Sequence, residues 1–454
     1  MALTMGALEL TESLEMTANN FMLILANHSS VGRGVKVRMM CVLMINVILL
    51  GHALASSGLP KDETFDSCAK APKIAALFLE GGWKMGYPQA LILQNLEGEF
   101  RSCLGVDPNL PAHEKPRLGE AFDFVGGTSE GALAALFLTV ADETGTRPRY
   151  DLSQLVGFYE GDGRDGAGNP TFVSSAAAKL YEDMTECDND SSWDGDTSSD
   201  EESSWDDEAE VALRQQRSEE LSHALTELGL SVPLKSACVP TFINATELCQ
   251  DNTTPKPFQF KSHDMGAFSD LTAAQVAHCA LASPMFLDPV CVQDASGNER
   301  LFLESGLMQH YGPSIAFLKE AGLLHGDGAQ NLLFISVGTR FVPILERGFE
   351  PKGIGMLNWA KPIMDLILRP QSPTSDEIIK TLLSDKDPEG LGGYIPWSPA
   401  LDCARAKDLA TPERLAYLRR MTLVFLGKRQ DAFKDSARKL ARRYQVKMRA
   451  RAAH

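Results

Sequence analysis

The segment FDFVGGTSEGALAALFL, which runs from Phe122 to Leu138, decides the fold of this chain. A short apolar run ends in two glycines, and an Ala/Leu-rich helical pattern follows directly after a turn. Ser129 lies at the centre of Gly127–Gly131, whose letters GTSEG fit the G-x-S-x-G pattern of a nucleophile elbow between a strand and a helix. We therefore predict a catalytic serine here, although so short a pattern also fits an ordinary turn.

The glycines on either side of this serine suit such an elbow. Gly127 and Gly131 lack a Cβ atom, which a close approach of strand and helix backbones would exclude. Ser129 would then project beside the N–H groups of a helix N-terminus, and these groups can stabilise a developing oxyanion. A hydrolytic site needs a second catalytic group, which must come from elsewhere in the chain.

Length and composition favour a globular enzyme-sized protein. The chain has 454 residues, of which 44% are hydrophobic and 23% charged, enough for one large α/β domain or two ordinary ones. The formal net charge of −17 argues against nucleic acid as a partner. Most of this charge comes from residues 182–210, which contain fourteen Asp or Glu and no Lys or Arg. This acidic segment is too poor in apolar residues to offset its ordering entropy, so we predict a disordered insertion.

The nine cysteines are dispersed, and no Cys/His group has the spacing of a zinc site. We therefore expect neither a metal nor another cofactor.

The N-terminal prefix, residues 1–72, contains a candidate targeting segment. Residues 39–55 combine a basic flank, an apolar run and the sequence Ala53-Leu54-Ala55, which resembles a cleavage site. A cleaved signal peptide, an uncleaved anchor and an N-terminal helix all fit this pattern. A signal would make the protein secreted or endomembrane, and its absence would make it cytoplasmic.

The rest of the chain alternates strands with helices. Residues 73–79 form a buried-strand pattern that leads into the glycine-rich loop Glu80–Gly86 and then a helix, an arrangement that binds anions. Further strand and helix patterns follow, and the last hundred residues look mainly helical. Such alternation predicts a mostly parallel sheet with helices on both faces.

The order of these motifs matches a known family. After the glycine-rich loop and the GTSEG turn come a helix ending in Ala282-Ser283-Pro284, a strand ending at Glu304, and a strand ending in Ser336-Val337-Gly338-Thr339. From about Lys73 to Ala441 the chain resembles the patatin-like phospholipases and acyl hydrolases. The resemblance implies a three-layer α/β sandwich over residues 73–445, followed by a basic tail at 446–454. It also implies a Ser-acid dyad without a histidine, in which Ser129 attacks the acyl carbonyl of a lipid or phospholipid.

The oxyanion loop departs from the family pattern D-G-G-G-x-[RK]-G. Gly81 and Gly82 carry over as the implied N–H donors, and Gly86 also matches. Trp83 replaces the third glycine, and Met85 replaces the basic residue.

The family acid, the aspartate of D-G-G/A, is also altered. Counting from the strand places Glu304 at its position, whereas counting back from Pro313 places Ser305 there. We favour Glu304, because a longer carboxylate can still reach the serine proton if the backbone retreats. Loss of the base is the alternative, and the chain order also leaves open a histidine, His310 or His325.

The segment from Lys428 to Arg451 is a basic amphipathic helix. It has ten Lys or Arg, and an apolar stripe consists of Phe433, Ala437, Leu440 and Tyr444. Peripheral contact with anionic lipid, docking on the protein body, and pairing with the acidic segment all fit this pattern.

Together these features predict a lipid acyl hydrolase of the phospholipase A or lysophospholipase type. The alternative is a catalytically degenerate patatin-like protein that binds a lipid or a partner.

Overall fold

The computed structural model describes ten stretches of the chain: residues 71–81, 86–160, 208–248, 255–284, 287–305, 312–338, 340–341, 371–384, 386–401 and 411–453. The chain divides into two compact units, Met1–Ala69 and Lys70–His454, and all the described residues belong to the second. The predictions for residues 39–55 and for all but the last three residues of the acidic segment lie outside the described part.

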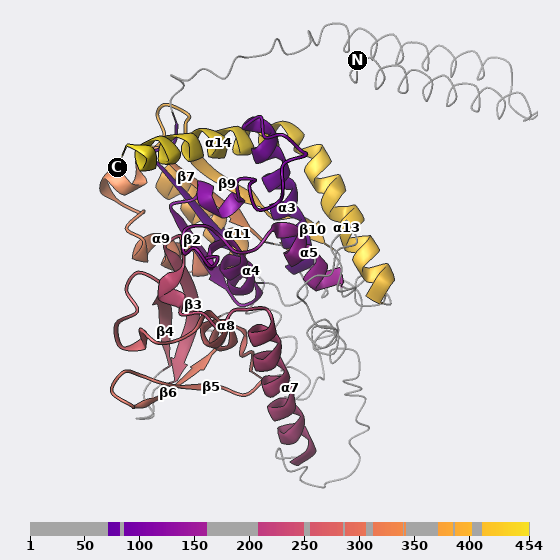
Figure 1. Cartoon of the computed structure of the whole chain (residues 1–454), viewed down its shortest axis with the longest axis vertical. Coiled ribbons are helices and arrows are strands. Elements are labelled where there is room, and N and C mark those ends of the chain that lie inside the picture. The colour runs from indigo at the N-terminus through magenta and orange to yellow at the C-terminus, as the bar shows by residue number, and fades with distance from the viewer. Residues whose placement is uncertain are drawn as a thin grey trace, which may run out of the picture. The chain divides into compact units, whose positions relative to one another are not determined.

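An eight-stranded, mostly parallel sheet forms the centre of the second unit (Figure 1). Its strands are β1 (Ile74–Leu79), β2 (Phe124–Thr128), β3 (Thr241–Leu248), β4 (Lys256–Lys261), β5 (Val290–Gln293), β6 (Glu299–Leu303), β7 (Leu332–Val337) and β9 (Gly393–Trp397). The order is β5-β6-β3-β2-β1-β7-β9, and β4 pairs with β3. Strands β3, β2, β1, β7 and β9 are parallel, whereas β4, β5 and β6 join antiparallel. A separate pair consists of β8 (Arg340–Phe341) and β10 (Ala400–Leu401).

Helices cover both faces of this sheet, as the sequence predicted. Nine α-helices lie in the described part: α3 (Gly86–Cys103), α4 (Glu130–Thr139), α5 (Leu152–Glu160), α7 (Glu208–Glu227), α8 (Ala273–Leu281), α9 (Pro313–Glu320), α11 (Gln371–Leu383), α13 (Thr411–Lys428) and α14 (Gln430–Ala452). Successive side chains of β1 point to opposite faces, so Leu77 and Leu79 join one core cluster while Ala76 and Phe78 join another. The first cluster includes α3, α4, α5, α7, α8, α13 and α14, and the second includes α9 and α11. The unit is therefore a three-layer α/β sandwich.

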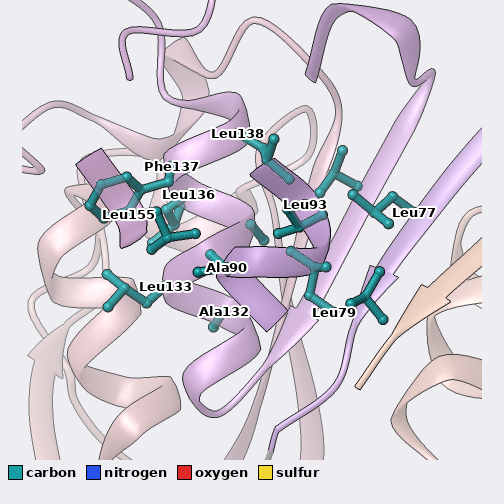
Figure 2. Close-up of a cluster of buried hydrophobic side chains, with 14 of the residues drawn as sticks. Leu77, Leu79, Ala90, Leu93, Ala132, Leu133, Leu136, Phe137, Leu138 and Leu155 are labelled. Atoms are coloured by element: carbon teal, nitrogen blue, oxygen red, sulfur yellow. The ribbon is translucent and has the colours of Figure 1, made fainter. Parts of the chain in front are cut away.

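Helix α4, which follows the GTSEG turn, is completely enclosed by the fold. All ten of its residues are buried, which explains why its sequence has no polar face. Figure 2 shows its side chains Leu133 and Leu136 packed in the same cluster as Ala90 of α3 and Leu77 of β1. The start of this helix is thus held firmly against the sheet.

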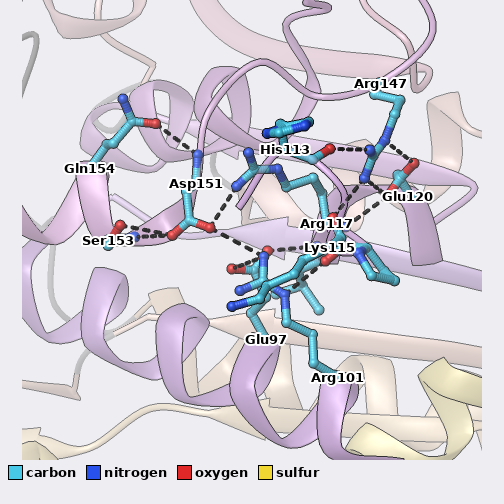
Figure 3. A network of polar contacts seen from close by, with 12 residues as sticks. Glu97, Arg101, His113, Lys115, Arg117, Glu120, Arg147, Asp151, Ser153 and Gln154 are labelled. Atoms are coloured by element: carbon cyan, nitrogen blue, oxygen red, sulfur yellow. Dashed lines mark hydrogen bonds and ion pairs between the residues drawn. The ribbon is translucent and has the colours of Figure 1, made fainter. Parts of the chain in front are cut away.

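A polar network fixes the chain on the approach to β2 (Figure 3). The Asp151 carboxylate before α5 accepts hydrogen bonds from Arg101 of α3 and from Arg117, at 3.2 and 2.5 Å. Glu97 of α3 accepts the main-chain N–H of Leu118, in the short helix η1 (Leu118–Ala121), at 2.9 Å. Burial raises the pKa of Glu97 to about 7, even though its pairing with Arg101 and its hydrogen bond from Leu118 oppose the shift.

Helix α14 docks on the protein body. Its stripe residues Phe433, Ala437 and Leu440 are buried, and Tyr444 packs edge-on against Phe100 with ring centroids 5.5 Å apart. Arg443 donates two hydrogen bonds of 2.8 Å to the Asp123 carboxylate. Of the alternatives that the sequence left open for this helix, docking is therefore the one that the structure shows. Within the described part of the chain, no helix has the length and apolar content needed to cross a bilayer.

Candidate active site

The sheet brings the ends of β2 and β6 together on one edge of β3. Strand β4 pairs with residues 242–247 of β3, so it occupies one edge of β3 except at the two end residues. Both β2, which pairs with residues 241–244, and β6, which pairs with residues 246–248, must therefore lie on the other edge. The two strands approach each other head to head, because β2 is parallel and β6 antiparallel to β3. Their pairing stops on either side of Ala245, where Ser129 and Glu304 follow the two strands.

Ser129 has the backbone conformation of a strained elbow. Its φ of 51° and ψ of −130° lie in a region that L-residues other than glycine rarely adopt. Ser129 is the N-cap of α4 and is only 3% exposed. A residue held this way costs on the order of 1–3 kcal/mol and persists only where the surrounding structure enforces it.

The two glycines of the elbow allow the close packing that holds Ser129 in this conformation. A Cβ atom on Gly131 would lie 2.2 Å from the carbonyl oxygen of Leu79, and one on Gly127 would lie 2.3 Å from the carbonyl oxygen of Gly131. Neither distance is compatible with a larger residue. The end of β1, the turn and the start of α4 therefore contact each other through bare backbone.

Glu304 lies beside the Ser129 hydroxyl. The residue is half-buried, but its carboxyl group lies in the protein interior, and burial raises its pKa. Hydrogen bonds from the Ser129 and Ser283 side chains lower the pKa of the same carboxyl, and the effect of burial is the larger. The main-chain N–H of Glu304 also donates a 2.9 Å hydrogen bond to the carbonyl of Ala282, which fixes this strand end to the end of α8.

Ser305, the other residue at the position of the family acid, has a different partner. Its hydroxyl lies 2.5 Å from the hydroxyl of Thr128, and both side chains are buried. Of the two residues, Glu304 is thus the one brought to Ser129. Its role as the base remains a prediction.

The first part of the glycine-rich loop lies against the nucleophile. A Cβ atom on Gly81 would lie 2.8 Å from Cβ and 3.5 Å from Oγ of Ser129. Gln89 of α3 donates hydrogen bonds to the carbonyls of Glu80 and Val337, at 3.1 and 2.8 Å. It thereby joins the start of the loop to the end of β7. Residues 82–85, which include Gly82, Trp83 and Met85, lie outside the described residues, so the oxyanion role predicted for Gly82 remains a prediction.

The histidine alternatives gain no support. His310 lies outside the described residues. His325 is exposed and caps the short helix η4 (Gly326–Ala329), which precedes β7. It therefore lies at the amino end of β7, whereas Ser129 follows the carboxyl end of β2.

Three residues of this site were missed by the sequence analysis. Ser283 was noted only as part of a motif, Thr128 only as a letter in the elbow, and Glu130 had no assigned role. The Glu130 carboxylate accepts the main-chain N–H of Gly86 at 2.9 Å. Its place inside the G-x-S-x-G pattern was the one local signal that could have drawn attention to it.

Comparison with known proteins finds relatives that are named patatin or patatin-like. No protein-family model matches the chain. Patatin-like protein 2 of Arabidopsis thaliana is 24% identical over 367 residues, covering 76% of this chain and 81% of the relative. Patatin-like protein 1 of the same plant is 25% identical over 318 residues, covering 65% and 67%. Patatin group M-2 of Solanum tuberosum is 37% identical over 97 residues, covering 21% and 23%. The chain is thus similar to patatin-like proteins over most of its length, at low identity.

Proposed function

We propose that this protein is a serine lipid acyl hydrolase that cleaves the acyl esters of glycerolipids or phospholipids. Ser129 is the nucleophile and Glu304 is the general base. The observation that carries the proposal is the place of the buried Glu304 carboxyl beside the Ser129 side chain at the strained elbow. Similarity to patatin-like proteins supports a lipid ester as the substrate.

The chemistry follows from the arrangement of the two residues. Glu304 takes the proton of the Ser129 hydroxyl while Oγ attacks the acyl carbon, and a tetrahedral oxyanion forms. The proton on Glu304 then passes to the departing alcohol, the ester C–O bond breaks, and an acyl-enzyme remains. Glu304 next deprotonates a water molecule that attacks the acyl-enzyme. The proton then passes from Glu304 to Oγ of Ser129 as the acyl–Oγ bond breaks, and the fatty acid leaves. A pKa raised by burial suits this task, because a base works best when its pKa lies near the operating pH.

Two sources of N–H groups are available for the oxyanion. Ser129 caps α4, so the first N–H groups of that helix, at Glu130 and Gly131, face the region of the hydroxyl with the positive end of the helix dipole. Gly81, whose backbone approaches Ser129, supplies the second source, and the sequence pattern assigns the same role to Gly82.

A fluorophosphonate probe that reacts with activated serines tests this proposal. We expect labelling of the wild type, loss of labelling in Ser129→Ala, and unchanged labelling in Ser236→Ala, which alters an exposed serine. Glu304→Gln should retain the fold, as measured by circular dichroism, and lose ester hydrolysis. An unlabelled wild type that still binds phospholipid vesicles would support the alternative, a patatin-like binding module without turnover.

The membrane contact predicted for the basic C-terminal helix remains a separate proposal. Its apolar stripe is buried, so contact would depend on cations such as Arg438, Arg449 and Arg451, which are exposed. Arg443 and Lys439 bind Asp123 and the carbonyl of Gly392, just before β2 and β9. The helix therefore lies at the amino ends of the strands, whereas Ser129 lies beyond a carboxyl end.

Charge reversal of the exposed arginines should weaken sedimentation with phosphatidylserine vesicles and leave hydrolysis of a soluble ester unchanged. Undiminished sedimentation would contradict the contact.

A further inference from the structure

The Thr128–Ser305 hydroxyl pair joins the two catalytic strand ends. Thr128 immediately precedes the proposed nucleophile, and Ser305 immediately follows the proposed base. Their hydroxyl oxygens are 2.5 Å apart, although 177 positions separate them in the sequence. Thr128 is 3% exposed and Ser305 is fully buried, so solvent is excluded from the contact.

This contact lies where no main-chain pairing joins the two strand ends. Main-chain pairing to β3 stops at Asn244 for β2 and begins again at Thr246 for β6, which leaves the two ends facing each other across Ala245. No pairing between β2 and β6 is present in the described sheet. The hydroxyl pair is thus a direct side-chain link between one strand end and the other.

The link also restrains the backbone next to Ser129, which is strained. Ser129 is held at a φ of 51°, and a strained backbone relaxes when a neighbouring restraint is removed. Because Thr128 and Ser305 are directly bonded to Ser129 and Glu304 through the chain, a shift of either hydroxyl changes the separation of the reacting side chains. An error of even 1 Å in such a geometry can lower a rate about a hundredfold.

We propose that Thr128 and Ser305 are positioning residues, whose hydroxyl–hydroxyl contact sets the distance between the Ser129 nucleophile and the Glu304 base. The inference rests on the proposed function. It also gives a reason for Ser305, which follows the acid at a position where the family pattern has glycine. The longer carboxylate of Glu304 reaches Ser129 from a strand end that this serine ties to β2.

A double-mutant cycle tests the inference. Thr128→Val and Ser305→Ala each remove one hydroxyl, the combined variant removes both, and Thr128→Ser is the conservative control because it keeps the hydroxyl. Each single variant should lower kcat about tenfold with KM little changed, since substrate binding is left intact. The combined variant should be no slower than the worse single variant, and Thr128→Ser should stay within about threefold of the wild type.

Two readouts separate this inference from the proposed function. Urea unfolding of the wild type, the two single variants and the combined variant measures the coupling of the two hydroxyls without any need for activity. Coupling in unfolding together with the kcat pattern supports the positioning role. Absent coupling, additive kcat losses, or a Thr128→Ser variant as slow as Thr128→Val would overturn it. A wild type that shows coupling but neither hydrolyses esters nor reacts with the fluorophosphonate would refute the proposed function, and the positioning role with it, while the contact itself would stand.

Discussion

The main-chain N–H of Gly86 donates a 2.9 Å hydrogen bond to the carboxylate of Glu130. This bond joins the end of the glycine-rich loop to the first residue of α4, immediately after the proposed nucleophile. The start of the loop also meets the elbow, since the backbone of Gly81 lies against Ser129. Gly81 and Gly86 are thus both joined to the elbow, although the loop and the nucleophile follow different strands.

Removal of the Glu130 carboxylate should detach the far end of this loop. Hydrogen bonds to charged groups contribute about 1.5–3 kcal/mol, so Glu130→Ala should lower kcat/KM about tenfold or more. Glu130→Gln retains an acceptor oxygen of the same reach and should stay within about threefold of the wild type. Steady-state hydrolysis of a soluble ester measures both. Equal losses in the two variants would show that the acceptor oxygen is not what matters.

The contact between Gly81 and the nucleophile yields a sharper prediction. An alanine Cβ at this position would lie 2.8 Å from Cβ of Ser129, so the loop or the serine must move. We expect Gly81→Ala to slow fluorophosphonate labelling about a hundredfold, as a displacement near 1 Å would.

The matched control for Gly81→Ala is Gly98→Ala in α3. A Cβ on Gly98 meets no other atom within 4 Å. This change should leave labelling unchanged and stabilise the protein by about 0.5–1 kcal/mol, because glycine is unfavourable within a helix. Normal labelling in Gly81→Ala would show that the loop does not touch the serine in solution.

Local features of this fold were predictable from the sequence because their causes are local. The apolar run before Gly126, the paired glycines and the Ala/Leu pattern specify β2, the turn and α4 by sterics and burial alone. Strand β9 was missed, and the last hundred residues were expected to be mainly helical. Gly393 and Pro396 interrupt the strand pattern of β9. This strand forms through its pairing with β7, at one end of the described sheet order. Only the presence of β7 makes that segment a strand.

The proposed acid illustrates the limit of local reasoning. Glu304 and Ser305 could not be separated by counting, because the chain carries one more residue than the family pattern before Pro313. The structure separates them by the partner of each side chain. Glu304 turns to Ser129, and Ser305 turns to Thr128. This outcome depends on two strands sharing one edge of β3, which no short sequence pattern records.

Burial of Glu97 should make the stability of the protein depend on pH. Its pKa is about 7 in the folded state, above the usual value of about 4.3 for an unfolded chain, so the folded state binds the proton more tightly. The stabilisation that this group contributes is complete below the unfolded pKa and is lost as the pH rises through 7.

Glu97→Gln removes this titration and keeps an acceptor for the Leu118 N–H. Between pH 4 and pH 8, the free energy of unfolding of the variant should improve relative to the wild type by up to about 3 kcal/mol. Urea unfolding at several pH values measures the difference. Parallel pH profiles for the two proteins would mean that Glu97 does not titrate in this range.

The acid limb of the pH–rate profile should report on Glu304. A general base must be ionised, and burial raises the pKa of this carboxyl, so kcat/KM should fall at a pH above the ordinary range of a glutamate, about 4.3. Ser283→Ala removes a hydrogen bond that favours the ionised form, so the limb should move to higher pH. Ser283→Thr keeps a hydroxyl and should leave the limb near its wild-type position. A limb that Ser283→Ala leaves in place would mean that the group titrating in the rate is not the carboxyl beside Ser129, and the base would then have to be sought elsewhere.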